Sequence, residues 1–243
     1  MNYEFIPVKT RVVMPPKDEI WDIIDSLDVR DGDVVFITSK IMGIHQGRTR
    51  VVGEVEKEDL IRECSEYYLP YENRAGWHVN LTITDGVLIP AAGIDESNAN
   101  GHYILWPERV DELCREIRAR LMKRTGVKRL GVVSTDSHTT PLRWGVTGIT
   151  IGLAGVEPTR DIRGNEDIFG REMKVTKVNQ LDALTGMAVL LMGESNEQTP
   201  VVILRGYEGL EYSDTASMEG YKIDIDDDLY QPLLDVMREH PSK

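Results

Sequence analysis

Apolar runs and amphipathic segments alternate along the chain, a pattern typical of an α/β or α+β protein rather than a helix bundle or a β-sandwich. Runs rich in β-branched and aromatic residues predict strands at residues 3–8, 33–38, 77–83, 87–92, 130–134, 174–178 and 201–204. Apolar positions at helical spacing predict helices at residues 20–27, 58–69, 107–125, 181–192 and 228–238. The predicted fold class is therefore α/β (α+β), with mixed sheets and helices.

Glycine and proline positions mark the turns between these elements. Asp85-Gly86 predicts a tight hairpin, and Pro107 and Gly126 bracket the clearest helix. The glycines of residues 145–155 have two interpretations, a strand packed closely against another backbone or a nucleotide-binding loop. Neither GxGxxG nor the GxxxxGK loop motif occurs in that segment, so we favour close packing. The same close approach predicts a dimer.

The net charge of -13 argues against a broad nucleic-acid-binding surface, because phosphate binding depends on clustered Lys and Arg. Much of the acidity lies near the end of the chain, and we divide the chain into a domain at 1–206 and an acidic extension with a short helix at 207–243. Cys64 and Cys114 lie on predicted helix faces and are expected to be buried thiols, which fits a reducing compartment. No apolar run approaches the ~20 residues that span a bilayer, so we expect a soluble cytoplasmic protein.

Three acidic residues stand where apolar elements end, which places a carboxylate at the rim of a core. They are Asp95 in GIDESN, Asp136 in STDSHTT and Glu194 in LLMGES. Carboxylate oxygens are the ligands that Mg²⁺ or Mn²⁺ prefers, and the hydroxyl of Ser137 could add another oxygen. Each carboxylate alone has a simpler interpretation as a helix cap or turn residue.

Other polar residues in similar places could contact phosphate. Ser39 and Lys40 follow a buried strand directly, and Asn98 lies three residues after Asp95. The alternatives are an ordinary exposed lysine and an Asx turn. The sequence also holds four closely spaced arginines that could bind carboxylates or phosphates or pair with neighbouring acids: Arg143, Arg160, Arg163 and Arg171.

Several common catalytic arrangements are missing from the sequence. The five histidines show no HExxH spacing, which makes a zinc hydrolase a poor explanation. No GxSxG elbow accompanies the serines, and neither cysteine has the setting of an activated nucleophile. His138 is the one histidine inside a candidate site loop, and it is a candidate general base.

Taken together, GIDESN, Thr135-Asp136, GVTGITIGLAG, GNEDIFGRE, LLMGE and VVILRG resemble the coenzyme F420-0:L-glutamate ligase family in order and approximate spacing. The likeness extends from about Asp31 to Gly206. It implies an α/β fold with two lobes, usually built as an intertwined homodimer. It also implies an enzyme that uses GTP or ATP, two Mg²⁺ or Mn²⁺ ions and a K⁺ ion, and adds L-glutamate to a carboxylate acceptor through an acyl phosphate.

The resemblance also assigns roles to individual residues. The metal ligands would be Asp95, Asp136, Ser137 and Glu194. Nucleotide contacts would come from Arg11, Val12, Val13, Met14, Ser39, Lys40, Asn98, Gly193, Ser195 and Asn196. Arg163 and Arg171 are candidates for binding the glutamate carboxylates, with Arg143 and His138 as candidate catalytic residues.

Two positions depart from the family pattern. Ile44 stands where a nucleotide-contacting lysine is expected, and Lys40 is a candidate to replace its charge. In DSHTTPLRWG, Thr140 stands where the family has the arginine of a GR pair, which opens the alternative that the acceptor is a folate. A catalytically silent nucleotide-binding relative is a further alternative, which the three retained carboxylates disfavour.

Overall fold

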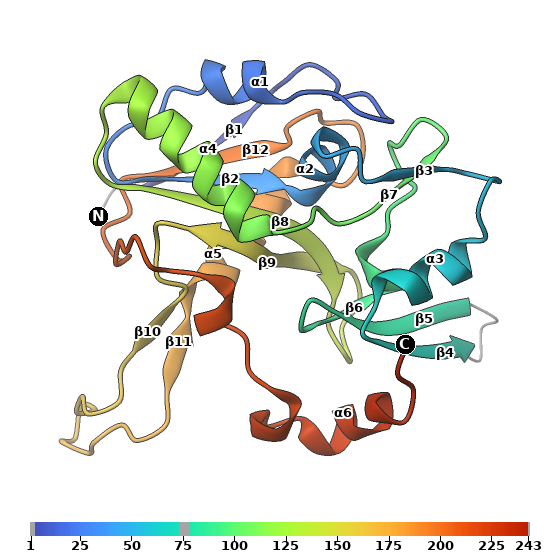
Figure 1. The fold of residues 1–243 in the computed structure, drawn as a ribbon. Coiled ribbons are helices and arrows are strands. Elements are labelled where there is room, and N and C mark those ends of the chain that lie inside the picture. The colour runs from blue at the N-terminus through green and yellow to red at the C-terminus, as the bar shows by residue number, and fades with distance from the viewer. Residues whose placement is uncertain (1–2, 73–77, 243) are drawn as a thin grey trace.

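The computed structural model describes residues 3–72 and 78–242, and its centre is a five-stranded mixed sheet (Figure 1). The strand order is β1 (Glu4–Val8), β12 (Val201–Arg205), β2 (Asp33–Thr38), β8 (Leu130–Thr139) and β9 (Val146–Ala154). Strands β2 and β8 are parallel, and the other neighbours are antiparallel. This arrangement confirms the predicted α/β class.

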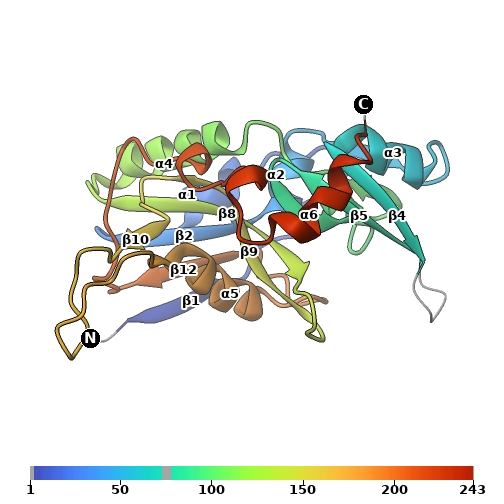
Figure 2. The same cartoon turned by 90° about the horizontal axis from the view of Figure 1, so that it is seen from below.

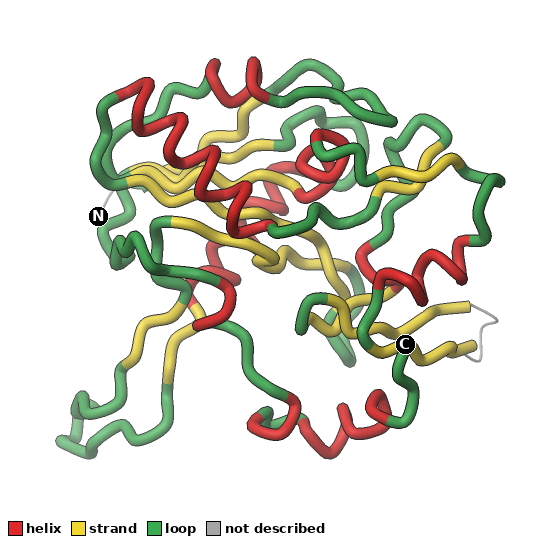
Figure 3. Tube along the Cα trace, in the orientation of Figure 1, coloured by secondary structure: helices red, strands yellow, loops and turns green. Residues whose placement is uncertain are grey.

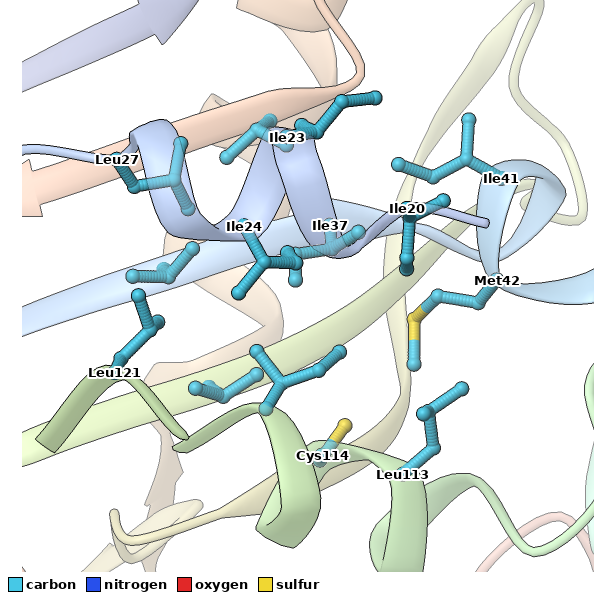
Figure 4. Close-up of a cluster of buried hydrophobic side chains, with 14 of the residues drawn as sticks. Ile20, Ile23, Ile24, Leu27, Ile37, Ile41, Met42, Leu113, Cys114 and Leu121 are labelled. Carbon is cyan, nitrogen blue, oxygen red and sulfur yellow. The ribbon is translucent and has the colours of Figure 1, made fainter. Parts of the chain in front are cut away.

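Helices cover both faces of this sheet, and this packing buries β2 on both of its faces. One face packs against α1 (Trp21–Ser26), α2 (Ser39–His45) and α4 (Val110–Thr125), whose apolar side chains meet in one cluster (Figure 4). The opposite face packs against α5 (Gln180–Met192), which lies in front of the sheet when the molecule is seen from below (Figure 2).

The glycines of β9 allow both helices to approach the sheet closely. A Cβ atom on Gly152 would lie 2.2 Å from Cγ1 of Val110 on α4, and one on Gly148 would lie 2.5 Å from the carbonyl oxygen of Thr185 on α5. The packing interpretation of these glycines is therefore confirmed. The backbone and side chains that they approach belong to the same chain, so these glycines give no support to the dimer prediction.

Smaller sheets lie beside the central one (Figure 3). One contains β4 (Tyr67–Glu72), β5 (His78–Thr84) and β6 (Val87–Pro90), and another pairs β3 (Thr49–Val51) with β7 (His102–Ile104). Helix α3 (Lys57–Cys64) and the 3-10 turn η1 (Ala91–Gly93) pack between them. Asp85 and Gly86 both have positive φ values, which confirms the predicted hairpin turn.

Several predicted boundaries are wrong. The helix predicted at 58–69 ends at Cys64, and Tyr67 begins strand β4, because aromatic residues suit a strand and β5 provides a partner. Helix α4 begins at Val110 rather than Pro107, after Arg109 in a left-handed conformation. Strand β8 extends five residues beyond the predicted end at Ser134, to Thr139. The predicted strand residue Trp77 lies outside the described residues.

Two further segments project from the sheet on the side of α5 (Figures 1 and 2). The first is a hairpin of β10 (Thr159–Asp161) and β11 (Lys177–Asn179). The strand predicted at 174–178 therefore begins later, at Lys177, and ends one residue beyond the predicted end. The second is the C-terminal segment, with η2 (Met218–Gly220), η3 (Ile225–Asp227) and α6 (Gln231–Arg238). Its end returns to β4, where the amide of Tyr68 donates to the carbonyl of His240 at 2.9 Å. Among the described residues, no helix has the length and apolar character needed to cross a membrane.

Candidate active site

A cavity of about 330 Å³ opens at the carboxyl end of β2, beside the parallel strand β8. Ligand sites in α/β sheets commonly form outside the carboxyl ends of the strands. Residues drawn from five separate stretches of the chain line this cavity, although not every residue of each stretch does: 10–13, 38–44, 95–98, 135–137 and 189–200. The three predicted carboxylates, Asp95, Asp136 and Glu194, all lie in its wall.

Asp136 is the most deeply placed of the three carboxylates. The β8–β9 register shifts between Ser134 and Thr135 and skips Ile151, and such an irregularity re-aims the side chains that follow. Oδ2 accepts a hydrogen bond from the indole N–H of Trp106, and Oδ1 accepts one from the amide of Ser137 at 2.8 Å. Burial raises the pKa of the Asp136 carboxyl to about 7, and the charge of Asp95 adds to this increase.

Asp95 is held as an anion by its neighbours. The ammonium of Lys40 forms an ion pair with Oδ2, while the amide and hydroxyl of Ser97 donate to Oδ1 at 2.8 and 2.9 Å. Burial works to raise the pKa of Asp95, but Lys40 and Ser97 outweigh burial and lower it. Lys40 also donates to the carbonyl of Ser97 at 2.9 Å, which fixes its ammonium in the cavity wall.

Glu194 stands at the exposed rim, in the loop that follows α5. Its carboxylate is 3.4 Å from the hydroxyl of Ser137, and partial burial raises its pKa. The same loop is joined to the Asp95 segment by Asn98, whose side-chain amide donates to the carbonyl of Ser195 at 2.6 Å. Within the loop, the amide of Ser195 donates to Glu197 at 2.9 Å.

The remaining predicted nucleotide contacts are divided between the cavity and its surroundings. Arg11, Val12, Val13, Gly193 and Asn196 line the cavity. The guanidinium of Arg11 is bound by Asp18 and Asp22, which raises its pKa and leaves it engaged in structural ion pairs. Met14 and Ser39 do not line the cavity, and Ser39 is buried at the start of α2.

Four predicted catalytic or substrate residues lie outside the cavity lining. His138 is half-buried on β8, where burial lowers its pKa. Arg143 is exposed in the β8–β9 loop and donates to the carbonyl of Leu142 at 3.0 Å. Arg163 pairs with Asp161 on the β10–β11 hairpin, and Arg171 lies exposed near the hairpin tip. Their closeness in sequence to site motifs does not bring these side chains to the cavity of the same chain.

Ile44 lies in the cavity wall and Trp106 lies beside the cavity. Ile44, which stands where the family pattern has lysine, lines the cavity with its apolar side chain, and Lys40 is the lysine in that wall. Trp106 contacts Asp136 directly, yet sequence reasoning missed it. The preceding strand and the following Pro107 gave no chemical signal, since a buried tryptophan is ordinarily a core residue.

The donor set suits a hard divalent cation, although the side chains do not form a complete metal site. Within the described residues, no three His, Cys, Asp or Glu side chains are placed to hold a metal ion by themselves. The positive charge of Lys40 acts on all three carboxylates: it helps to lower the pKa of Asp95, and it opposes the increases that burial causes at Asp136 and Glu194. Three carboxylates against one ammonium leave an excess of negative charge, and oxygen ligands of this kind are those that Mg²⁺ and Mn²⁺ accept.

Comparison with known proteins gives this cavity a family context. Residues 7–206 match the family described as F420-0:gamma-glutamyl ligase. The chain is 34% identical over 227 residues to the coenzyme F420:L-glutamate ligase of Methanopyrus kandleri, covering 85% of this chain and 87% of that protein. It is 30% identical over 239 residues to the protein of the same name from Archaeoglobus fulgidus, covering 90% and 92%. These matches confirm the resemblance seen in the sequence motifs, and the chain belongs to the F420-0:gamma-glutamyl ligase family.

Proposed function

We propose that this chain is a ligase that uses a nucleoside triphosphate and divalent metal to join L-glutamate to a carboxylate of an F420-type acceptor. The observation that carries the proposal is the meeting of Asp95, Asp136, Glu194 and Lys40 in one cavity from separate parts of the chain. Family membership supplies the reaction class, since the relatives are named coenzyme F420:L-glutamate ligases.

Amide formation from a free carboxylate is uphill in water, so the acceptor carboxylate must first become electrophilic. In the proposed first step, a carboxylate oxygen of the acceptor attacks the γ-phosphorus and nucleoside diphosphate leaves. The amine of glutamate then attacks the acyl carbon, inorganic phosphate leaves, and the amine loses a proton. Overall, one nucleoside triphosphate is converted to diphosphate and phosphate for each amide formed.

In the proposed mechanism, some residues of the cavity would bind the divalent cations and Lys40 would bind phosphate. Asp95, Asp136, Glu194 and the hydroxyl of Ser137 would hold the divalent cations, which neutralise charge on the transferred phosphoryl group when bound. Lys40 would exchange part of its pairing with Asp95 for a phosphate oxygen, because ammonium groups bind both anions. Asn98 would hold the Ser195 loop in place over the nucleotide.

We also propose that the chain acts as a homodimer, on grounds different from the β9 glycines. Leu142 and Trp144 in the β8–β9 loop are 96% and 101% exposed, and Ile168 and Phe169 at the hairpin tip are 91% and 89% exposed. Exposed apolar side chains of this size are typical of an interaction surface. The same two projections carry Arg143, Arg163 and Arg171, so pairing would allow one copy to present these arginines to the cavity of the other.

The function is tested by incubating the protein with L-glutamate, Mg²⁺ or Mn²⁺, GTP or ATP, and F420-0 or a folate. Mass spectrometry should show an F420-0 product heavier by one glutamyl residue, with equal release of nucleoside diphosphate. If product forms only from a folate, the proposed ligase reaction holds, but the acceptor is a folate rather than F420-0. Absence of product with every acceptor, together with normal nucleotide binding, would support a silent relative. Light scattering at micromolar concentration tests the dimer, which a monomeric mass would contradict.

A further inference from the structure

Trp106 is the side chain that joins the cavity to the neighbouring core, and it lies on the segment between β7 and α4. Its indole N–H donates to Oδ2 of Asp136, although the residue is only 7% exposed and is not part of the cavity lining. Tryptophan has one polar atom, which donates and cannot accept. The indole therefore cannot take a proton from Asp136, and its effect on the carboxylate is to orient it.

The ring is fixed by its surroundings rather than by Asp136 alone. It packs in a cluster with Val87, Ile89 and Ile151, and Ile151 is the residue that the β8–β9 register skips. The irregularity that precedes Asp136 on β8 therefore also supplies a side chain that supports the indole. On the backbone side, Nε of Arg48 donates to the carbonyl of Trp106 at 3.2 Å.

Gly93 leaves the space in which the indole nitrogen sits. A Cβ atom at this position would lie 2.2 Å from Nε1 and 2.3 Å from Cε2 of Trp106. Gly93 also has a φ of 68°, a conformation that side chains disfavour. The backbone at Gly93 and the position of the Trp106 nitrogen thus fit each other closely.

The hydrogen bonds to Asp136 leave part of its carboxylate available. Ser137 occupies one position on Oδ1 and Trp106 one position on Oδ2, whereas an ionised carboxylate has about four acceptor positions. The remaining acceptor positions of the Asp136 carboxylate are available to a ligand, because this side chain lines the cavity. A ligand oxygen whose direction is fixed by an outer hydrogen bond binds a metal better than a mobile one.

We propose that Trp106 is a positioning residue that fixes the Asp136 carboxylate, so that its remaining lone pairs serve the divalent cation of the reaction. This role rests on the proposed function, since it assumes that Asp136 binds metal. Trp106 does not line the cavity, so it would act through Asp136. Loss of its N–H should weaken metal binding while the fold and the nucleotide pocket stay intact.

The test compares Trp106→Phe, which keeps an aromatic ring and loses the donor, with Trp21→Phe as a matched control. Trp21 packs edge-on against His45, away from the cavity lining. Mn²⁺ affinity is measured by electron paramagnetic resonance titration, and nucleotide affinity by calorimetry in metal-free buffer. Trp106→Phe should weaken Mn²⁺ binding by about tenfold or more, with nucleotide affinity unchanged, and Trp21→Phe should leave both unchanged.

A second variant distinguishes loss of the N–H donor from loss of folding. Replacing Trp106 with 3-benzothienylalanine keeps the shape of the indole and substitutes sulfur for the N–H group, so it should reproduce the weaker Mn²⁺ binding with a wild-type unfolding midpoint. Wild-type Mn²⁺ affinity in either folded variant would overturn the role of Trp106 alone. Asp136→Asn separates the two proposals, because unchanged Mn²⁺ binding in that variant would overturn the metal site itself.

Discussion

The side-chain amide of Asn98 donates a hydrogen bond of 2.6 Å to the backbone carbonyl of Ser195, joining two loops 97 residues apart in the sequence. One loop carries Asp95 and the other carries Glu194, so this contact sets how two candidate metal ligands face each other. Asn98 has a φ of 53°, in the left-handed region. Its backbone conformation and its side-chain hydrogen bond therefore both shape the cavity.

Asn98→Gly should weaken nucleotide binding without disturbing the fold. Glycine adopts the left-handed conformation freely, so this change removes the side chain without adding backbone strain. Loss of one hydrogen bond predicts a rise in the nucleotide Kd of up to about tenfold, or ~1.4 kcal/mol. Asn100→Gly is the matched control, because Asn100 has a φ of 46° and does not line the cavity. Equal effects in the two variants would contradict the role of Asn98.

Lys40→Met should weaken nucleotide binding more strongly. The change keeps an unbranched side chain of similar length and removes the only lysine in the cavity wall, within the residues that the structure describes. Charge-assisted hydrogen bonds contribute about 1.5–3 kcal/mol, which predicts a loss of affinity of at least about tenfold by calorimetry. Lys57→Met is the control, since Lys57 pairs with Glu96 at 3.1 Å outside the cavity lining. Wild-type nucleotide affinity in the Lys40→Met variant would contradict the proposed contact between Lys40 and phosphate.

Gly152→Ala should destabilise the protein by overpacking the contact between β9 and α4. The added methyl group would meet the side chain and backbone of Val110, and changes of this kind cost about 1–3 kcal/mol. Urea unfolding should show a lower midpoint. Gly220→Ala is the control, because no atom lies within 4 Å of the position that its Cβ would take, and it should change stability by less than about 0.5 kcal/mol. Equal midpoints would show that the packing at Gly152 is looser than described.

Cys114 should be unreactive in the folded protein at a pH of about 8. Burial raises the pKa of its thiol well above the ordinary value of 9.0, and the charge of Asp111 adds to the increase. Since the thiolate is the reactive form, raising the pH toward 8 does not activate this buried group. The prediction of a buried thiol is confirmed for Cys114 and wrong for Cys64, which is only partly buried at the end of α3. A thiol reagent should therefore label Cys64 before unfolding and Cys114 only in urea. Rapid labelling of the native Cys64→Ser variant would contradict the burial of Cys114.

The sequence predicted the core elements well where local signals and long-range packing agree. Strand β2 was predicted at 33–38, as observed, because its apolar run is bounded by a turn and a polar segment. Helix α5 was predicted to within one residue for a similar reason. Strand β4 was missed because its stability depends on antiparallel pairing with the next strand, β5, which the apolar periodicity of residues 58–69 does not report.

The candidate site was predictable in its residue types and less so in its contacts. Asp95, Asp136 and Glu194 each follow an apolar element, so sequence reasoning placed them at the rim of the core, where they lie. It could not show that Lys40 pairs with Asp95, nor that the indole of Trp106 binds Asp136, because the partners come from distant segments. Closeness in sequence does not by itself place a side chain in the site, since Arg143 follows Asp136 by seven residues and does not line the cavity of its own chain.

The central claim is that the acceptor carboxylate is activated as an acyl phosphate before glutamate attacks. The most direct test uses F420-0 with both oxygens of the reacting carboxylate replaced by a heavy isotope, together with glutamate, a nucleoside triphosphate and metal under single-turnover conditions. Mass spectrometry of the released inorganic phosphate should find one heavy oxygen in each phosphate formed, because the carboxylate oxygen that attacks phosphorus leaves with it. Amide product formed alongside phosphate that contains no heavy oxygen would contradict the proposed mechanism.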